Sequence, residues 1–337
     1  MTRLIAWLNA TGKGECLEHV ACNLCGSTRH TPVYEMPDTR FFPNERFTVV
    51  ECNECGLGFV NPRPSFAEMP KYYPPEYYQP PPSGGFQQYL LRRFRAEARY
   101  LRDLEKLRRT TKLLDVGCGS GDFPRFMKSR GWQVEGVEVS GHTAGSSEFR
   151  IYREEFQNIA VAEPIYDAVT AWAVLEHVHD PLAYFRKASQ VLKKNGYFVF
   201  LVTNFHSMAS RHLFGEDIPR HLYFFTRQTV RRYLEKTGFV LEYEDNGRSV
   251  YKMAPANWLA YLLQTKVRGK AFRFEDVPLS SREFRRVHGL SRGLSTSWQY
   301  LRYSPVSVVE RMLFPAVEIV QILTKTYGIS TYMARKS

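Results

Sequence analysis

Nine residues near the middle of the chain, Leu113–Gly121, have the composition of a loop that binds a small molecule. They read LLDVGCGSG, an apolar run that reaches an acid at Asp115 and then alternates glycine with other residues at Gly117, Gly119 and Gly121. Glycine lets a backbone approach a ligand closely, and a helix starting after the loop would add its free N–H groups. The stretch therefore predicts a strand–loop–helix junction that holds a cofactor.

The glycine spacing narrows the choice of cofactor. A dinucleotide fingerprint needs Gly-x-Gly-x-x-Gly, or Ala at the last position, because the third small residue packs the helix against the strand. Gly117 and Gly119 fit the first two positions, but Asp122 occupies the third. The loop also lacks the Lys-Ser/Thr pair of a phosphate-binding P-loop.

The residues after the loop extend the pattern. Apolar residues at helical spacing continue to Gly131, which predicts a helix. A second strand then ends near Glu138, about 20 residues past the glycines, where an acidic side chain binds the ribose hydroxyls in nucleotide-binding sheets. The alternative is a surface glutamate at a strand end.

Four of the six cysteines form two near copies of one motif, Cys22-Asn-Leu-Cys25-Gly and Cys52-Asn-Glu-Cys55-Gly. Two such knuckles predict a tetrahedral zinc site with four sulfur ligands, which leaves no open position and is therefore structural. The alternatives are two disulfides or a redox Cys-x-x-Cys. Cys16 and His19 lie nearby as spare ligands.

Two histidines could act as a general base, because imidazole titrates near neutral pH. His177 follows a long apolar run, Tyr166–Leu175, and His221 opens the segment His221–Thr226. Glu176 could orient either ring. The alternative role for each histidine is a hydrogen bond that supports its loop.

Strand and helix patterns alternate from Lys112 to Glu244, which predicts a doubly wound α/β sheet. The expected strands are Leu113–Val116, Val134–Ser140, Tyr166–Leu175, Tyr197–Val202 and Phe239–Glu244. The expected helices follow Asp122, run over Pro181–Leu192, and begin after a capping Thr226 and end at Gly238.

Three motifs in this order resemble those of class I S-adenosylmethionine-dependent methyltransferases, of the small-molecule type that includes ubiquinone-pathway and sugar methyltransferases. The motifs are Leu113–Gly121, Tyr166–Pro181, and His221–Thr226 with its following helix. The resemblance implies a seven-stranded Rossmann-like sheet whose last strand, Ile329–Ala334, is antiparallel. It also implies S-adenosylmethionine as cofactor, with an N-terminal zinc ribbon beside the core.

The resemblance assigns site residues by position. The cofactor residues it implies are Asp115, Gly117, Cys118, Gly119, Gly121, Glu138, Val139, Glu155, Phe156, Trp172 and Leu175. The catalytic candidates are His177, His221 and Glu176, and the metal ligands are Cys22, Cys25, Cys52 and Cys55.

The remaining segments complete a predicted division of the chain. It has an N-terminal segment (1–19), the ribbon (20–61), a Pro/Tyr-rich linker and basic helix (62–110), the core (111–253), a helical insertion (254–326) and the final strand (327–337). The linker tyrosines could line a substrate cleft or pack the ribbon on the core. The arginines of Phe86–Arg109 are expected to form a solvated face. The insertion could cap the site, or contact a partner or an anionic membrane surface.

The chain carries a net charge of +12 with a pI of about 9.4. No run of 18 apolar residues predicts a spanning helix, and Met1–Ala10 is interpreted as an amphipathic start without a cleavage site. We expect a cytoplasmic protein that could rest on a membrane surface.

Three functions compete. The first is O- or C-methylation of a small acceptor such as a sugar, a nucleotide-linked sugar, a lipid-linked glycan or a quinone-like precursor, which could be phosphorylated. The second is RNA methylation, which a basic chain with a ribbon suits, although the residues after the fourth strand lack the Pro-Pro of base-nitrogen methylases. The third is a binding module without activity, against which the presence of Asp115, Gly117, Gly119 and Glu138 argues. The acceptor atom and the oligomeric state are left open.

Overall fold

The computed structural model describes residues 17–78, 85–107, 111–140, 148–247, 257–277 and 305–337. Met1–Ala10 and Cys16 lie outside the described residues.

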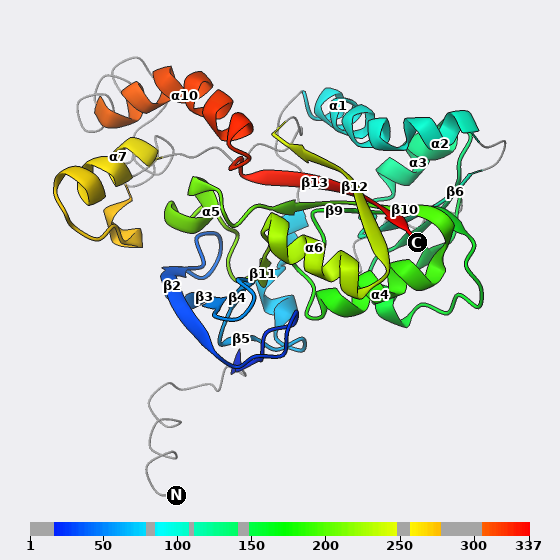
Figure 1. Cartoon of the computed structure of the whole chain (residues 1–337), viewed down its shortest axis with the longest axis horizontal. Helices are drawn as coiled ribbons and strands as arrows, with labels where there is room; N and C mark the ends of the chain where they lie inside the picture. The colour runs from blue at the N-terminus through cyan, green and yellow to red at the C-terminus, as the bar shows by residue number, and fades with distance from the viewer. Residues whose placement is uncertain (1–16, 79–84, 108–110, 141–147, 248–256, 278–304) are drawn as a thin grey trace, which may run out of the picture.

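A seven-stranded sheet organises the larger part of the molecule (Figure 1). Its spatial order is β12-β13-β10-β9-β6-β7-β8, in which the strands from β8 to β10 are parallel and β13 is antiparallel to both neighbours. The strands are β6 (Lys112–Val116), β7 (Gln133–Val137), β8 (Ile151–Tyr152), β9 (Tyr166–Trp172), β10 (Leu192–Thr203), β12 (Phe239–Asn246) and β13 (Ile329–Lys336). The predicted sheet, including its antiparallel last strand, is confirmed.

Helices cover both faces of the sheet. The helices α1 (Phe86–Ala98), α2 (Arg102–Leu107) and α3 (Asp122–Ser129) lie on one face, and α4 (Pro181–Val191) and α6 (Arg227–Lys236) lie on the other (Figure 1). Neighbouring residues of one strand therefore point into different cores, as Leu113 and Leu114 do. Burial on both faces explains why β9 is buried at every residue.

Local signals fix the helix ends, of which those at Thr226, Gly131 and Gly238 were expected from the sequence. The side chains of Thr226 and Thr229 cap the start of α6 reciprocally, and the Asp180 carboxylate accepts from Ala183 N at 3.0 Å at the start of α4. Gly131 and Gly238 follow helices with φ of 93° and 76°, in the left-handed region that ends helices at glycine.

The basic segment after the linker differs from the expected single helix. A 3₁₀ turn at Arg99–Leu101 separates α1 from α2. Arg93 pairs with the buried Glu97 at 2.8 Å, and Arg99 binds Asp245 and the hydroxyl of Tyr100. These two arginines thus form ion pairs with acidic residues of the folded protein, Glu97 and Asp245, and do not belong to a solvated face.

The predicted ribbon forms a second, four-stranded sheet, to which the core contributes one strand. Its order is β11-β4-β3-β2, with β2 (His30–Pro37), β3 (Arg46–Cys52), β4 (Gly58–Val60) and β11 (Tyr223–Phe224). A short pair, β1 (Leu17–Glu18) and β5 (Arg63–Pro64), flanks it. Because β11 comes from the stretch after β10, the two sheets share one apolar core.

The two cysteine knuckles have different neighbours despite their similar sequences. Asn23 of the first knuckle donates to Asp180 at 2.8 Å and accepts from Leu182 N at 3.0 Å and Tyr233 Oη at 2.9 Å. The equivalent Asn53 of the second knuckle is exposed. Only the first knuckle is therefore tied to α4 and α6 through its asparagine.

The predicted insertion lies between β12 and β13, and its described parts are helical. They are α7 (Trp258–Leu262), a π-helical turn (Leu263–Val267), a 3₁₀ turn (Phe274–Asp276) and α10 (Pro305–Leu323). The buried Glu310 carboxylate of α10 accepts from Leu259 N at 2.7 Å and so caps α7. Among the described residues, none of the helices has both the length and the apolar composition that crossing a bilayer requires.

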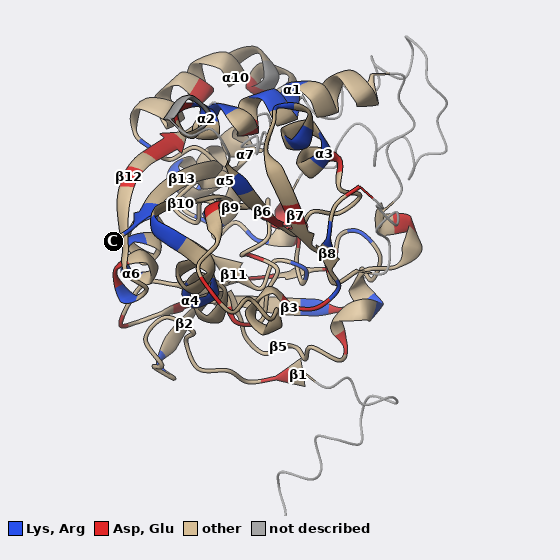
Figure 2. Ribbon diagram, turned by 90° about the vertical axis from the view of Figure 1, so that its right-hand side faces the viewer, with Lys and Arg blue, Asp and Glu red and all other residues tan. Residues whose placement is uncertain are grey.

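Acidic and basic side chains are distributed over both sheets and their helices (Figure 2). The described residues therefore show no separation of the net positive charge into one element.

Candidate functional site

The glycine loop joins β6 to α3 and takes left-handed backbone conformations that favour glycine. Gly117, Gly119 and Gly121 have φ of 69°, 52° and 80°. A Cβ at position 117 would lie 2.5 Å from Val174 Cγ2, and one at position 121 would lie 2.9 Å from Phe149 Cζ. A Cβ at position 119 would meet nothing within 4 Å, so the loop has an open side there.

Glu138 faces this loop from the end of β7. Its two carboxylate oxygens accept from Gly119 N and from Ser140 N, each at 2.8 Å. The acid predicted to bind ribose is thus directly beside the predicted cofactor loop. Cys118 is buried beneath the loop, where a Cβ on Gly136 would come within 2.6 Å of its sulfur.

Asp115 lies under the loop rather than in it. Its side chain is 2% exposed and accepts from Thr170 Oγ1 at 2.6 Å. Burial raises the pKa of Asp115 to about 8, which favours the neutral carboxyl at pH 7. Its position supports the loop between β6 and β9.

The other predicted cofactor residues fall into two groups. Val139 is 58% exposed, and Glu155 is half-buried at the start of a 3₁₀ turn (Phe156–Asn158), so both have accessible surface. The side chains of Phe156, Trp172 and Leu175 are buried. Phe156 packs on Tyr184 with ring centroids 5.6 Å apart, so its ring is part of the core.

A strained turn after β9 carries the catalytic candidates to the loop. Ala173 has φ of 56°, which is uncommon for a residue with a side chain. Directly after it, Val174 packs on Gly117, and Glu176 and His177 follow. The turn therefore links the glycine loop to the histidines.

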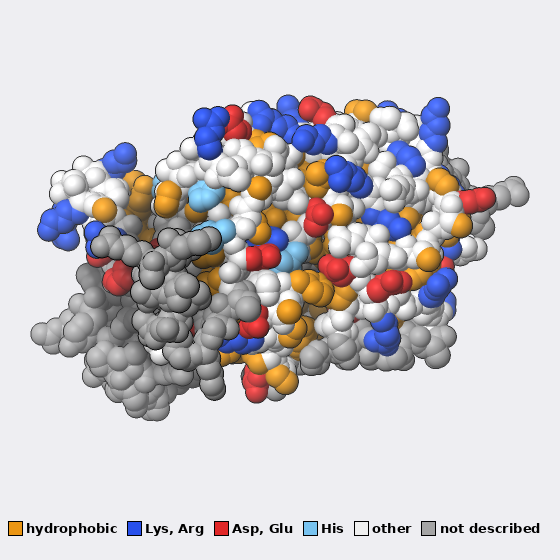
Figure 3. Space-filling model, turned by 90° about the horizontal axis from the view of Figure 1, so that it is seen from below, with side chains coloured by type: hydrophobic (Ala, Val, Ile, Leu, Met, Phe, Trp, Pro, Cys, Tyr) orange, Lys and Arg blue, Asp and Glu red, His pale blue; other side chains and the backbone are white. Residues whose placement is uncertain are grey.

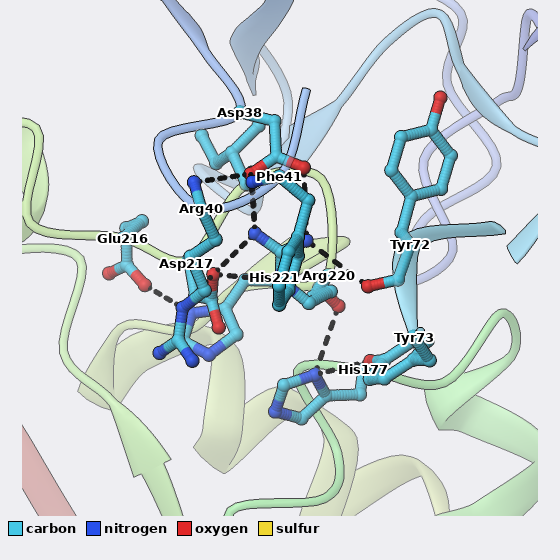
Figure 4. Close-up of polar contacts among 11 residues, drawn as sticks. Asp38, Arg40, Phe41, Tyr72, Tyr73, His177, Glu216, Asp217, Arg220 and His221 are labelled. Carbon is cyan, nitrogen blue, oxygen red and sulfur yellow. Dashed lines mark hydrogen bonds and ion pairs between the residues drawn. The ribbon is translucent and has the colours of Figure 1, made fainter. Parts of the chain in front are cut away.

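His177 and His221 meet edge to face, with ring centroids 4.6 Å apart. Figure 4 shows His221 beside Glu216, whose Oε2 accepts from His221 Nδ1 at 2.6 Å. Burial alone lowers the pKa of His221, but the Glu216 carboxylate outweighs burial and the pKa is raised. His221 therefore tends toward the cationic form.

His177 has the opposite tendency. Its Nδ1 lies 3.0 Å from the carbonyl oxygen of Arg220 and 3.0 Å from Tyr73 Oη (Figure 4). A carbonyl only accepts, so Nδ1 carries the hydrogen and Nε2 keeps a lone pair. Burial, assisted by the charge of His221, holds the pKa of His177 well below its usual value. His177 is thus a neutral imidazole whose Nε2 is unprotonated at pH 7 and available to accept a proton.

Glu176 completes this cluster. It is 1% exposed, and its Oε2 has no hydrogen-bond partner among the described residues. Burial raises the pKa of Glu176 to about 7, against the opposing charge of His221. Glu176, His177 and His221 offer ligand atoms within 4.8 Å of one another, a spacing that could hold a cation or pass a proton.

A fully buried arginine, which the sequence analysis missed, supports the cluster. Arg220 binds both oxygens of Asp38, at 2.8 and 3.1 Å, and Asp217 at 2.8 Å. It also donates to the carbonyl oxygen of Tyr72 at 3.2 Å (Figure 4). Arg220 stands directly before the motif that begins at His221. Its partner Asp38 is 182 residues away, so the local pattern did not indicate a buried ion pair.

The linker tyrosines lie beside both parts of the site. Tyr73 contacts His177, and Tyr77 packs on Tyr73 with ring centroids 4.9 Å apart. Burial, followed by the charge of Glu138, raises the pKa of Tyr78. This arrangement favours the cleft-lining role over simple packing of the ribbon.

The four predicted metal ligands converge at one point. The Sγ atoms of Cys22 and Cys55 are 3.4 Å apart, those of Cys25 and Cys52 are 3.5 Å apart, and all four lie within 4.8 Å. A disulfide needs about 2.05 Å, whereas Zn–S bonds of about 2.3 Å in a tetrahedron place sulfurs roughly 3.8 Å apart. The geometry fits zinc.

Part of this chain matches a protein family model and several known enzymes. The model of a methyltransferase domain family, Methyltransf_23, matches residues 86–244. A ubiquinone biosynthesis O-methyltransferase of Leptothrix cholodnii is 38% identical over 103 residues, which cover 27% of this chain and 43% of that protein. The same enzyme of Chromobacterium violaceum is 34% identical over 108 residues, covering 29% and 47%. The chain thus spans less than half the length of these relatives.

Solved structures resemble the chain more distantly. The structure of a putative sarcosine dimethylglycine methyltransferase from Galdieria sulphuraria is 18% identical, covers 73% of this chain and 86% of that chain, and has a TM-score of 0.46.

Zinc analysis of the purified chain tests the sulfur site. We expect one zinc per chain by mass spectrometry and a lower melting temperature after chelation, because the ribbon shares its core with the large sheet. Cys52→Ser should lose the metal, whereas Cys118→Ser, outside the cluster, should keep it. If the purified protein contains no zinc and chelation leaves its melting temperature unchanged, the cluster holds no structural ion.

Proposed function

We propose that residues 86–244, which match a methyltransferase domain family, form a class I S-adenosylmethionine-dependent methyltransferase domain that methylates an oxygen or carbon atom of a small acceptor. The proposed acceptor is a sugar, a nucleotide-linked sugar or a lipid-linked glycan. The observation that carries the proposal is the neutral His177, held by the turn whose Val174 packs on the glycine loop. The contact of Val174 with Gly117 supports a proposed base at His177 close to the proposed cofactor loop.

The residues of the loop suit the methyl donor. The backbone of Gly117–Gly121 would hold its methionyl end on the open side at Gly119, and Glu138 would bind the ribose hydroxyls. Backbone groups at Glu155 and Phe156 would meet the adenine. When bound, S-adenosylmethionine supplies a methyl group on a positively charged sulfur.

His177 would act as the general base. S-adenosylmethionine would supply the methyl group to the acceptor oxygen in exchange for its carbon–sulfur bond, and His177 Nε2 would accept the acceptor proton, leaving the methylated acceptor, S-adenosylhomocysteine and a protonated His177. Since His221 already tends to be cationic, the buried Glu176 carboxylate is the group that would offset the second positive charge.

The ribbon contributes structure and part of the site. We propose that zinc fixes the two knuckles, while the segment after β2 delivers Asp38 to Arg220. Four thiolate ligands leave no position for substrate, so the ion would take no part in methyl transfer.

RNA methylation receives less support. On the face in Figure 3, Lys and Arg side chains alternate with Asp, Glu and hydrophobic side chains rather than forming a continuous basic track. The residues Ala171–Val174, at the end of β9 and in the turn after it, contain no Pro-Pro element.

Binding of S-adenosylhomocysteine tests the cofactor site. Calorimetry should show binding to the wild-type chain and at least tenfold weaker binding to Glu138→Ala, because hydrogen bonds to a charged group contribute about 1.5–3 kcal/mol. Glu163→Ala, which removes an exposed carboxylate of the same domain, is the matched control. No binding heat at millimolar S-adenosylhomocysteine would contradict the cofactor assignment. Equal affinity of wild type and Glu138→Ala for this ligand would contradict the ribose role of Glu138.

Turnover tests the base. With methyl-labelled cofactor and a panel of nucleotide sugars, His177→Gln should lower kcat by roughly 10²–10⁴-fold at unchanged S-adenosylhomocysteine affinity. His206→Gln, an exposed histidine, should not change kcat.

The pH profile gives an independent check. Because the pKa of His177 is depressed, protonation of this base should lower wild-type turnover only well below pH 6.5, after a first decrease near pH 7 where the Glu176 carboxylate is protonated. Removing the neighbouring charge with His221→Gln should raise the pKa of His177 and move the lower of these two acid limbs to higher pH. Equal turnover for His177→Gln, or a lower acid limb that does not move, would assign both histidines a structural role.

A further inference from the structure

One cation at the edge of the site has no role in the proposed mechanism. Arg40 comes from the ribbon, in the segment between β2 and β3, and its side chain is 51% exposed. Its Nε lies 3.1 Å from Asp217 Oδ1, and its guanidinium lies over the Tyr77 ring at 5.3 Å from the centroid. The residue thus touches both the core and the linker.

The backbone that carries Arg40 is held firmly. Asp38 accepts from Arg40 N at 2.8 Å and from Phe41 N at 3.3 Å, and its own N–H donates to the Glu45 carbonyl at 3.0 Å. The same Asp38 carboxylate is bound by both terminal nitrogens of the buried Arg220. A loop fixed at this many points presents its side chain from a defined position.

The hydrogen bonds of Arg40 are unevenly used. Asp217 is held mainly by Arg220, which is fully buried and binds it with two nitrogens. The Arg40 side chain approaches Asp217 through Nε, and among the described residues its two terminal nitrogens donate no hydrogen bond. Those nitrogens form the fork that binds phosphate or carboxylate oxygens in pairs.

Arg40 is also close to the proposed reaction. The carbonyl oxygen of Asp217 accepts from His221 N at 2.8 Å, so Arg40 is one residue removed from the histidine pair. The positive charge of Arg40 contributes to the lowered pKa of His177 and acts on Tyr77. A group bound by Arg40 would therefore lie beside Tyr77 and next to Asp217, whose carbonyl oxygen binds the backbone of His221.

We propose that Arg40 binds a phosphate or diphosphate group of the acceptor and thereby positions the acceptor against His177. The proposal rests on the proposed function and narrows its acceptor to phosphorylated molecules. The phosphate could belong to a nucleotide-linked or a lipid-linked acceptor, and both carriers present the same oxygens to the guanidinium. Phosphate is favoured because its oxygens match the guanidinium fork of this half-exposed side chain, while the Tyr77 ring packs against the guanidinium.

Calorimetry with pyrophosphate on the zinc-loaded full chain, saturated with S-adenosylhomocysteine, tests the proposal. Arg40→Gln should weaken pyrophosphate binding at least tenfold, and Arg40→Lys should lie between it and wild type, because lysine keeps the charge but loses the fork. Arg29→Gln is the matched control, since Arg29 is a ribbon arginine whose side chain is 75% exposed in a pair with Glu54. Melting temperature and S-adenosylhomocysteine affinity should be unchanged in all three variants.

Uridine diphosphate and farnesyl diphosphate then distinguish the carriers, since the true carrier should bind more tightly than pyrophosphate and lose that affinity in Arg40→Gln. Equal pyrophosphate affinity for wild type and Arg40→Gln, or no binding to wild type at millimolar concentration, would overturn the proposal. If S-adenosylhomocysteine itself fails to bind wild type, the proposed function fails instead, so the two failures are distinguishable.

Discussion

The burial of one arginine is the constraint on which the site depends. The Arg220 side chain is fully excluded from solvent, and a buried charge is tolerated only when it is paired and hydrogen-bonded. Its partners are Asp38 of the ribbon, Asp217 of the core and the carbonyl of Tyr72 in the linker. Losing one partner of a buried pair costs about 3–5 kcal/mol, so these three segments must close around the guanidinium together.

The same residue couples this closure to the histidines. The carbonyl oxygen of Arg220 accepts from His177 Nδ1 and so leaves Nε2 free for a proton. The next residue is His221, whose charge adds to the effect of burial in holding the pKa of His177 well below its usual value. The ribbon supplies Asp38, and its strand β4 pairs with β11 of the core. It is therefore part of the proposed acceptor site rather than an appended module.

The sequence predicted the features that depend on local pattern. The glycine register, Glu138 at the strand end and the paired cysteines each follow from residues close together in the chain. The contacts that assemble the site could not be predicted in this way, because Asp38 and Arg220 are 182 residues apart and β11 has only two residues. Asn23 and Asn53 occupy equivalent positions in near-identical motifs, yet only tertiary packing decides which one is tied to the core.

The most direct test of this account is the effect of Asp38→Asn on turnover and on S-adenosylhomocysteine affinity, measured together. The substitution keeps the shape of the side chain and removes the charge that Arg220 needs. We expect kcat/KM for the acceptor to fall at least tenfold while the cofactor affinity stays within twofold of wild type, because the glycine loop and Glu138 do not contact Asp38. Unchanged turnover, or equal losses of turnover and cofactor affinity, would contradict the claim that the buried pair builds the acceptor side of the site.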